Sequence, residues 1–109
     1  MEIEKGFYYH YKHDIQGAVN NYAYEVTGIG HHTEIEGLEP SAMVLYRPLY
    51  ESAPVYTLGK HWDVRPYAMF IEDVKKDGKT IPRFTKITDE KVISELVKIK
   101  EIMYSEKAS

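Results

Sequence analysis

The stretch "TIPRFTKITDEKVISELVKIKEIMYSEK", Thr80 to Lys107, decides the fold because its pattern of apolar residues changes partway along. Its first eight residues follow Asp77-Gly78, a two-residue hairpin signal, and are expected to form the returning strand. After Thr88 the apolar residues recur at helical spacing. They are Val92, Ile93, Leu96, Val97, Ile99, Ile102 and Met103. We therefore predict one helix over residues 88–104, with Thr88 as its N-cap.

Upstream of this point, short alternating segments predict an antiparallel sheet. The expected strands are "GFYYHYK" (6–12), "YAYEVTGIGHH" (22–32), "AMVLYRPLY" (42–50) and "RPYAMFIEDV" (65–74), with a further short strand at 55–58. In the first strand, alternation separates Tyr8, His10 and Lys12 from Phe7, Tyr9 and Tyr11.

Three local features refine this prediction. Gly28 and Gly30 indicate a bulge or a close backbone approach near the end of the second strand. Pro48 is typical of an edge strand or a bend. The segment "EIEGLEPS" predicts a turn with one helical turn. We expect a single, mainly β domain over residues 1–109, in which a small curled antiparallel sheet or barrel (6–85) is covered by one C-terminal helix.

Composition excludes several classes of protein. The 109 residues carry a formal net charge of −3, which is unlike the basic excess of a dedicated nucleic-acid binder. Without cysteine the chain has neither disulfides nor thiolate metal ligands, and a cytoplasmic location is expected. No apolar run is long enough for a membrane span. Ten tyrosines stand out, since each buried hydroxyl needs a hydrogen-bond partner.

The end of the second predicted strand, "GIGHHTE", concentrates polar side chains. His32 and Glu34 would share one face if the strand continued that far. With His10 they could supply zinc ligands, but no H-E-x-x-H or comparable spacing is present. In the simpler interpretation, His32 and Glu34 hydrogen-bond each other and nearby backbone. We predict neither a metal nor a cofactor.

The segment "HWDVRP" offers a second set of recognition groups. Arg65 could bind a carboxylate or phosphate, and Trp62 could stack on a base or a sugar. In the simpler interpretation Trp62 lies in the core and Arg65 pairs with Glu72 or Glu34.

Four ordered motifs resemble a bacterial family known as domain of unknown function 1653. They are Gly6-x-Tyr8-x-His10-Tyr11-Lys12; Tyr24-x-Val26-x-Gly28 followed by His32-Thr33-Glu34; Val44-x-Tyr46 with Leu49-Tyr50; and Trp62, Arg65-Pro66, Met69-Phe70 and Glu72. Asp77, Gly78, Pro82, Arg83 and Phe84 match the closing hairpin. The resemblance covers roughly residues 6–85 and implies a small SH3-type barrel, without supplying an activity.

These observations favour a binding module for a small anionic or polar ligand, a small molecule or a nucleotide, because no catalytic signature is present. The predicted ligand-binding residues are Tyr8, His10, Lys12, His32, Glu34, Tyr46, Trp62 and Arg65. We expect His32 and Glu34 to lie within reach of His10 and Arg65 on one concave face. Two alternatives stay open: a small hydrolase or lyase with a His/Glu pair, and a structural domain whose helix drives homodimerisation.

Overall fold

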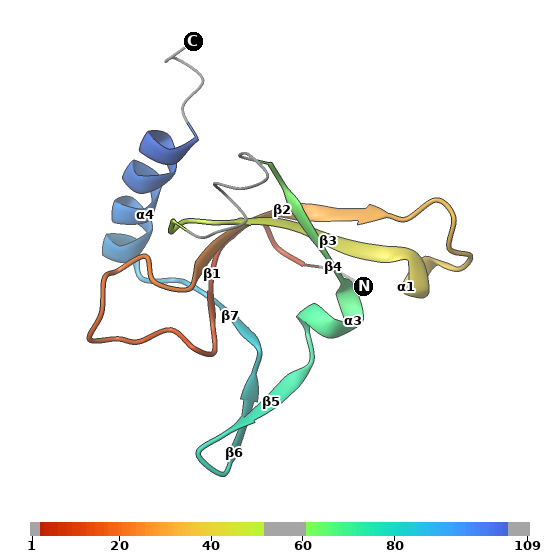
Figure 1. Ribbon diagram of the computed structural model, residues 1–109, viewed down its shortest axis with the longest axis horizontal. Coiled ribbons are helices and arrows are strands. Elements are labelled where there is room, and N and C mark those ends of the chain that lie inside the picture. The colour runs from red at the N-terminus through yellow and green to blue at the C-terminus, as the bar shows by residue number, and fades with distance from the viewer. Residues whose placement is uncertain (1–2, 52–60, 105–109) are drawn as a thin grey trace.

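A computed structural model of the protein describes residues 3–51 and 61–104 (Figure 1). Its centre is a five-stranded antiparallel sheet with the spatial order β4-β3-β2-β1-β7. These strands are β1 (Gly6–His10), β2 (Ala23–His31), β3 (Ala42–Pro48), β4 (Asp63–Pro66) and β7 (Phe84–Lys86). A separate hairpin pairs β5 (Asp73–Lys76) with β6 (Lys79–Pro82). The helices are α1 (Leu38–Ser41), α3 (Tyr67–Phe70) and α4 (Glu90–Met103).

The predictions of a mainly β fold and a C-terminal helix are confirmed, whereas the predicted SH3-type barrel is wrong for the described part of the chain. There β4 and β7 are both edges of an open sheet, and the β5–β6 hairpin forms a second sheet instead of closing the first. The expected strand over residues 65–74 is interrupted by α3, which turns the buried Phe70 into the core. This turn carries the hairpin away from β4 (Figure 1).

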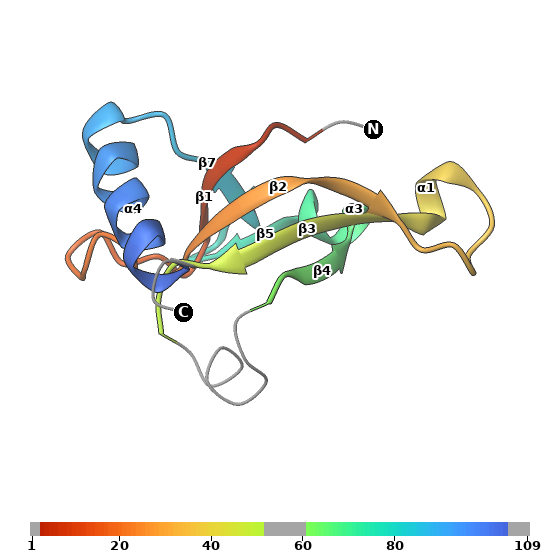
Figure 2. The same ribbon diagram turned by 90° about the horizontal axis from the view of Figure 1, so that it is seen from above.

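The sheet buries apolar side chains on both faces, in two separate clusters. Alternation along β1 separates them: Phe7 packs toward α4, and Tyr8 packs on the opposite face, as predicted. The α4-side cluster comprises Phe7, Ala23, Leu49, Ile87 and Leu96. The opposite cluster comprises Tyr8, Val26, Val44, Tyr46, Phe70 and Phe84. Figure 2 shows that α4 lies at one end of the sheet and leaves the end near α1 uncovered.

Helix α4 is close to the predicted range but begins one residue later than expected. Asp89, not Thr88, is the N-cap, and its carboxylate accepts hydrogen bonds from the backbone N–H groups of Lys91 and Val92. Leu96 and Met103 are buried. Val97 and Ile102 of the predicted stripe are 37% and 80% exposed, so the sheet uses only part of it. None of the described helices is long and apolar enough to cross a membrane.

Local backbone features explain the course of β2 and β3. The register between these strands shifts between Val26 and Gly28, which confirms the predicted bulge. A side chain at Gly30 would meet Leu45 Cδ1 at 3.1 Å, so it is the Leu45 side chain, not another backbone segment, that packs there. Of the edge strand or bend predicted at Pro48, the structure shows the bend: β3 lies between β2 and β4, ends at Pro48, and the chain bends over Leu49 and Tyr50.

The remaining local predictions have mixed outcomes. Asp77 and Gly78, with φ of 53° and 77°, form the predicted tight turn of the β5–β6 hairpin. The predicted helical turn near residue 38 is α1. The short strand expected at 55–58 lies outside the described residues.

Candidate functional site

The sheet face opposite α4 carries a continuous set of aromatic rings centred on His10. The His10 ring lies 5.7 Å from Tyr22, 6.5 Å from Tyr24 and 5.1 Å from Phe84, measured between ring centroids. Tyr46 and Tyr50 extend the set through Tyr24, at 5.5 and 5.6 Å. We call the rings of His10, Tyr22, Tyr24, Tyr46, Tyr50 and Phe84 the aromatic face. Four separate chain segments contribute to it, so it exists only in the folded protein.

Its central histidine is held neutral, in one tautomer. The backbone N–H of Lys12 donates to His10 Nδ1 at 3.2 Å, so Nδ1 accepts and the ring proton sits on Nε2. Burial, followed by the positive charges of Arg65, Lys12 and Arg83, lowers the pKa of His10 to about 4. At neutral pH this imidazole therefore offers one N–H donor and no charge.

Arg65 lies beside the rings with its guanidinium fixed by aromatic contacts. Its Nε donates to the Tyr46 hydroxyl at 3.4 Å, and its Cζ lies 5.8 Å from the Tyr46 ring and 5.6 Å from the Phe84 ring. Within residues 3–51 and 61–104, no acidic side chain forms an ion pair with Arg65 or with Lys12. These two side chains therefore add positive charge to the aromatic face that no acidic side chain of the described residues neutralises.

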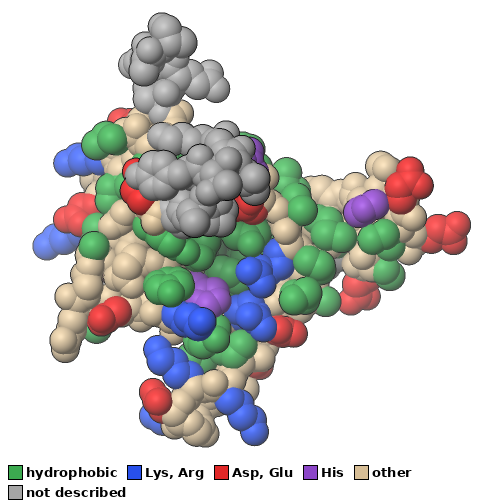
Figure 3. Space-filling view, viewed as in Figure 1, with side chains coloured by type: hydrophobic (Ala, Val, Ile, Leu, Met, Phe, Trp, Pro, Cys, Tyr) green, Lys and Arg blue, Asp and Glu red, His purple; other side chains and the backbone are tan. Residues whose placement is uncertain are grey.

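A third cation, Arg83, is compensated in part. Its guanidinium pairs with Glu72, the partner that the sequence suggested for Arg65. Figure 3 shows lysine and arginine side chains gathered around a histidine near the middle of the molecule and over hairpin β5–β6. A protein with net negative charge thus concentrates cations around one end of its aromatic face.

Two tyrosines close the other end of the aromatic face. The hydroxyls of Tyr24 and Tyr50 lie 2.5 Å apart and hydrogen-bond each other. Burial raises the pKa of both groups, so both stay protonated at physiological pH. The pair satisfies two partly buried hydroxyls and anchors Tyr50, which follows β3, over β2.

The predicted site residues divide into two groups. The structure brings His10, Lys12, Tyr46 and Arg65 together, and it places Tyr8 in the same core cluster as Tyr46. Tyr8 is only 6% exposed and its hydroxyl donates to the Glu4 carbonyl. That environment explains Tyr8 as a packing residue beneath the site.

The expectation that His32 and Glu34 would lie beside His10 and Arg65 is wrong. Strand β2 ends at His31, before either residue, so alternation no longer directs their side chains. Tyr22, which contacts His10, lies just before the opposite end of β2. At about 3.3 Å per residue, this nine-residue strand separates Tyr22 from His32 by roughly 30 Å. His32 and Glu34 are both exposed, and His32 Nδ1 accepts the backbone N–H of Glu34. The simpler interpretation of local hydrogen bonding describes them.

Trp62 is also separated from Arg65. Its ring lies 4.1 Å from Arg47 Cζ, and the Tyr104 ring covers the same guanidinium at 3.9 Å. Arg47 follows Tyr46 in β3 and so points to the α4 side, where Glu25 pairs with both Arg47 and Lys100. Trp62 is 37% exposed, so it is neither a core residue nor part of the aromatic face.

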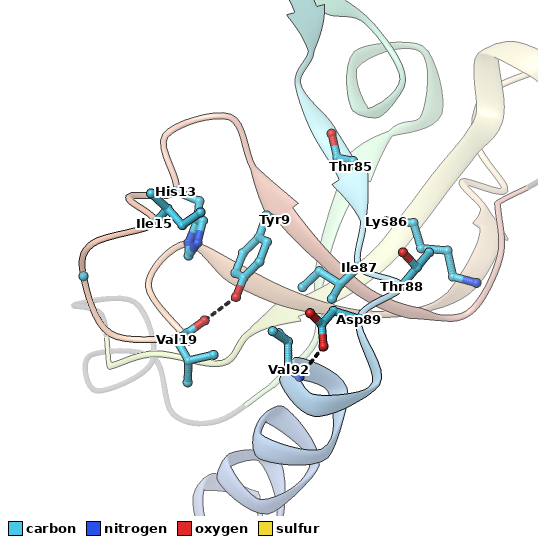
Figure 4. A pocket seen from close by; sticks show the side chains of 11 residues that line it. Tyr9, His13, Ile15, Val19, Thr85, Lys86, Ile87, Thr88, Asp89 and Val92 are labelled. Atoms are coloured by element: carbon cyan, nitrogen blue, oxygen red, sulfur yellow. Dashed lines mark hydrogen bonds between the residues drawn. The ribbon is translucent and has the colours of Figure 1, made fainter.

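A cavity of about 480 Å³ lies elsewhere, between the loop over residues 11–21 and the start of α4 (Figure 4). Three of its polar side chains are engaged within the protein. The Tyr9 hydroxyl donates to the Val19 carbonyl at 2.6 Å, and His13 Nδ1 lies 2.7 Å from the Asn21 carbonyl. Asp89 caps α4. None of the predicted site residues lines this cavity, and we regard it as less suited to a polar ligand than the aromatic face.

No group of three or more histidine, aspartate or glutamate side chains is placed to hold a metal ion in the described ranges. Sequence reasoning missed Tyr22, Tyr24, Arg83 and Phe84 as neighbours of His10, and it missed Tyr50 as a neighbour of Tyr24. Four of them lie in the motifs quoted above, which was the available signal. Tyr22 lies in none of these motifs. The position of its ring is set by a turn, which the sequence pattern did not predict.

The fold and the site define an open-sheet, mainly β protein with a C-terminal helix and one aromatic, cationic face. A family model described as Protein of unknown function (DUF1653) matches residues 6–86. The chain belongs to this family, which confirms the resemblance found in its motifs. No curated protein and no solved structure shows significant similarity to the chain. The match ends before α4, so the helix lies outside the shared region.

Proposed function

We propose that this protein is a binding module for a small anionic ligand, which it holds on the aromatic face beside His10 and Arg65. The observation that carries the proposal is the set of cations around one neutral histidine: Arg65, Lys12 and Arg83 all lower the pKa of His10. Arg83 pairs with Glu72, but Arg65 and Lys12 have no acidic partner within residues 3–51 and 61–104, so an anion between these two cations relieves their mutual repulsion.

The available hydrogen-bonding groups support the same class of ligand. His10 offers its Nε2–H, and Lys12 offers an ammonium group. The Arg65 guanidinium is oriented by Tyr46 through Nε, and within residues 3–51 and 61–104 no side chain accepts a hydrogen bond from its terminal nitrogens, which have the fork geometry that an anion matches. All three are donors, and phosphate and carboxylate oxygens are the acceptors that such donors match.

The hydrolase or lyase alternative has less support. A general base works best when its pKa lies near the operating pH, and a pKa of about 4 makes His10 a weak base at neutral pH. His32 and Glu34, the other predicted catalytic pair, are exposed and contact each other through a backbone N–H. The dimerisation alternative retains only Val97 and Ile102 as exposed apolar residues of the α4 stripe.

The test is a titration of ¹⁵N-labelled protein with inorganic phosphate and, separately, with acetate, followed by NMR. We expect shift changes at His10, Lys12 and the Arg65 Nε–H. Arg65→Gln should weaken phosphate binding roughly ten- to a hundredfold, because a charge-assisted hydrogen bond contributes about 1.5–3 kcal/mol. Lys98→Gln, an exposed change on α4, is the control and should bind as the wild type does.

Two results would contradict the proposal. One is equal phosphate binding by Arg65→Gln and the wild type. The other is a set of shift changes confined to the cavity between residues 11–21 and α4.

A further inference from the structure

Tyr22 occupies a backbone position that a tyrosine ordinarily avoids. The Ala23 N–H donates to the Asn20 carbonyl at 3.1 Å, which closes a four-residue turn with Tyr22 at its third position. There Tyr22 has a φ of +52°. Glycine or asparagine is the usual residue at a turn position with positive φ, because other side chains are strained there. Such strained residues are concentrated at functional sites.

Burial does not explain the choice of a tyrosine. The side chain of Tyr22 is 37% exposed, more than any other ring of the aromatic face. It stands nearly parallel to the His10 ring, with an interplanar angle of 27°, and contacts Tyr50 at 5.6 Å. The turn therefore holds a partly open ring at the rim of the aromatic face.

The open ring and the cations are close neighbours. His10 contacts Tyr22 on one side and Phe84 on the other, and Arg65 lies over the same Phe84 ring. One imidazole and one phenyl ring thus separate the stacking surface from the guanidinium. An inorganic anion would use the cationic end alone, whereas a molecule that carries both a planar ring and an anionic group would use both ends.

We infer that the ligand combines a planar ring with a phosphate, as a nucleoside monophosphate does, and that Tyr22 provides the surface on which the ring stacks. This inference rests on the proposed function, and it adds a planar ring to the anionic group of the proposed ligand. Bases stack readily on tyrosine and histidine, because every base presents a flat π-face. The phosphate then lies toward Arg65 and Lys12, and His10 Nε2–H donates to one of its oxygens.

The experiment compares four probes by isothermal titration calorimetry: AMP, ribose 5-phosphate, adenosine and inorganic phosphate. We expect AMP to bind at least about tenfold more tightly than ribose 5-phosphate, because base stacking adds to phosphate binding. Tyr22→Asn should reduce AMP affinity to that of ribose 5-phosphate and leave ribose 5-phosphate binding unchanged. Tyr22→Phe, which keeps the ring, should bind AMP as the wild type does.

The choice of asparagine separates binding from folding. Asparagine tolerates positive φ, so Tyr22→Asn relieves the backbone strain while it removes the ring. Its melting temperature is expected to stay within about 8 °C of the wild-type value. A loss of AMP binding by a variant that remains folded identifies the ring as a ligand contact.

The outcomes distinguish this inference from the proposal on which it rests. Equal affinity for AMP, ribose 5-phosphate and phosphate overturns the inference and leaves anion binding intact. The same holds if Tyr22→Asn binds AMP as well as the wild type does. Failure of every phosphate-bearing probe to bind overturns both.

Discussion

Replacement of Leu96 by alanine tests whether α4 is an integral part of the fold. Leu96 is 0% exposed and packs against Phe7, Ala23, Leu49 and Ile87, so the helix and the sheet share this contact. Leu96→Ala removes three buried carbon atoms. Each buried methylene contributes about 0.8 kcal/mol to the free energy of unfolding, so the loss of three such groups costs ~2.4 kcal/mol. The cavity left behind adds to this cost. We expect a loss of about 3–4 kcal/mol in the free energy of unfolding.

The assay is urea unfolding followed by circular dichroism, with the free energy extrapolated to water. Ile102→Ala is the matched control, because Ile102 lies on the same helix and is 80% exposed. It should change stability by less than about 0.5 kcal/mol. A loss below about 0.5 kcal/mol for Leu96→Ala would refute the packing of α4 on the sheet. An unchanged sheet signal with selective loss of helix would show that α4 unfolds separately.

Two further predictions concern the helix start and the central histidine. Asp89→Ala should lower the free energy of unfolding by ~1 kcal/mol, whereas Thr88→Ala should leave it nearly unchanged. Urea unfolding measures both, and a larger loss for Thr88→Ala than for Asp89→Ala would identify Thr88 as the N-cap. NMR titration of His10 should give a pKa near 4, below its ordinary 6.5, and Arg65→Gln should raise it; a wild-type pKa of 6 or above would contradict the described environment. Because the folded state disfavours the protonated ring, the stability contributed by His10 is present above about pH 6.5 and is lost as the pH falls toward 4.

Part of the fold follows from local sequence alone. The helical spacing of Val92, Leu96 and Met103 sets the helix, and alternation places Phe7 and Tyr8 on opposite sides of β1. Asp77-Gly78 determines a tight hairpin, because both positions need a positive φ. These features depend on neighbours within a few residues, which is why the sequence predicts them well.

The course of the chain between these elements was harder to predict. Residues 65–74 have the composition of one strand, but the fold buries Phe70 by forming the short helix α3 there. Helix α3 directs the β5–β6 hairpin away from β4, so the hairpin does not close the five-stranded sheet. Tertiary packing outweighs local preference at such a point, since the strand and the helical turn differ little in local energy.

The candidate site shows the same division. Sequence identified His10, Lys12, Tyr46 and Arg65 as polar or amphipathic residues in short motifs, and the fold brings these four together. The sequence could not predict the positions of His32 and Trp62. The direction of the His32 side chain depends on where β2 ends, and the position of Trp62 depends on which face of β3 Arg47 occupies.

Tyr22 is the clearest case of what only the tertiary structure decided. Its ring reaches the site through a turn with positive φ and through the antiparallel pairing that sets Ala23 opposite Tyr9. The sequence determined which side chains were available for recognition. Their common face, the neutral state of His10 and the field around it arise from contacts between residues far apart in the chain, and such contacts have no local signature.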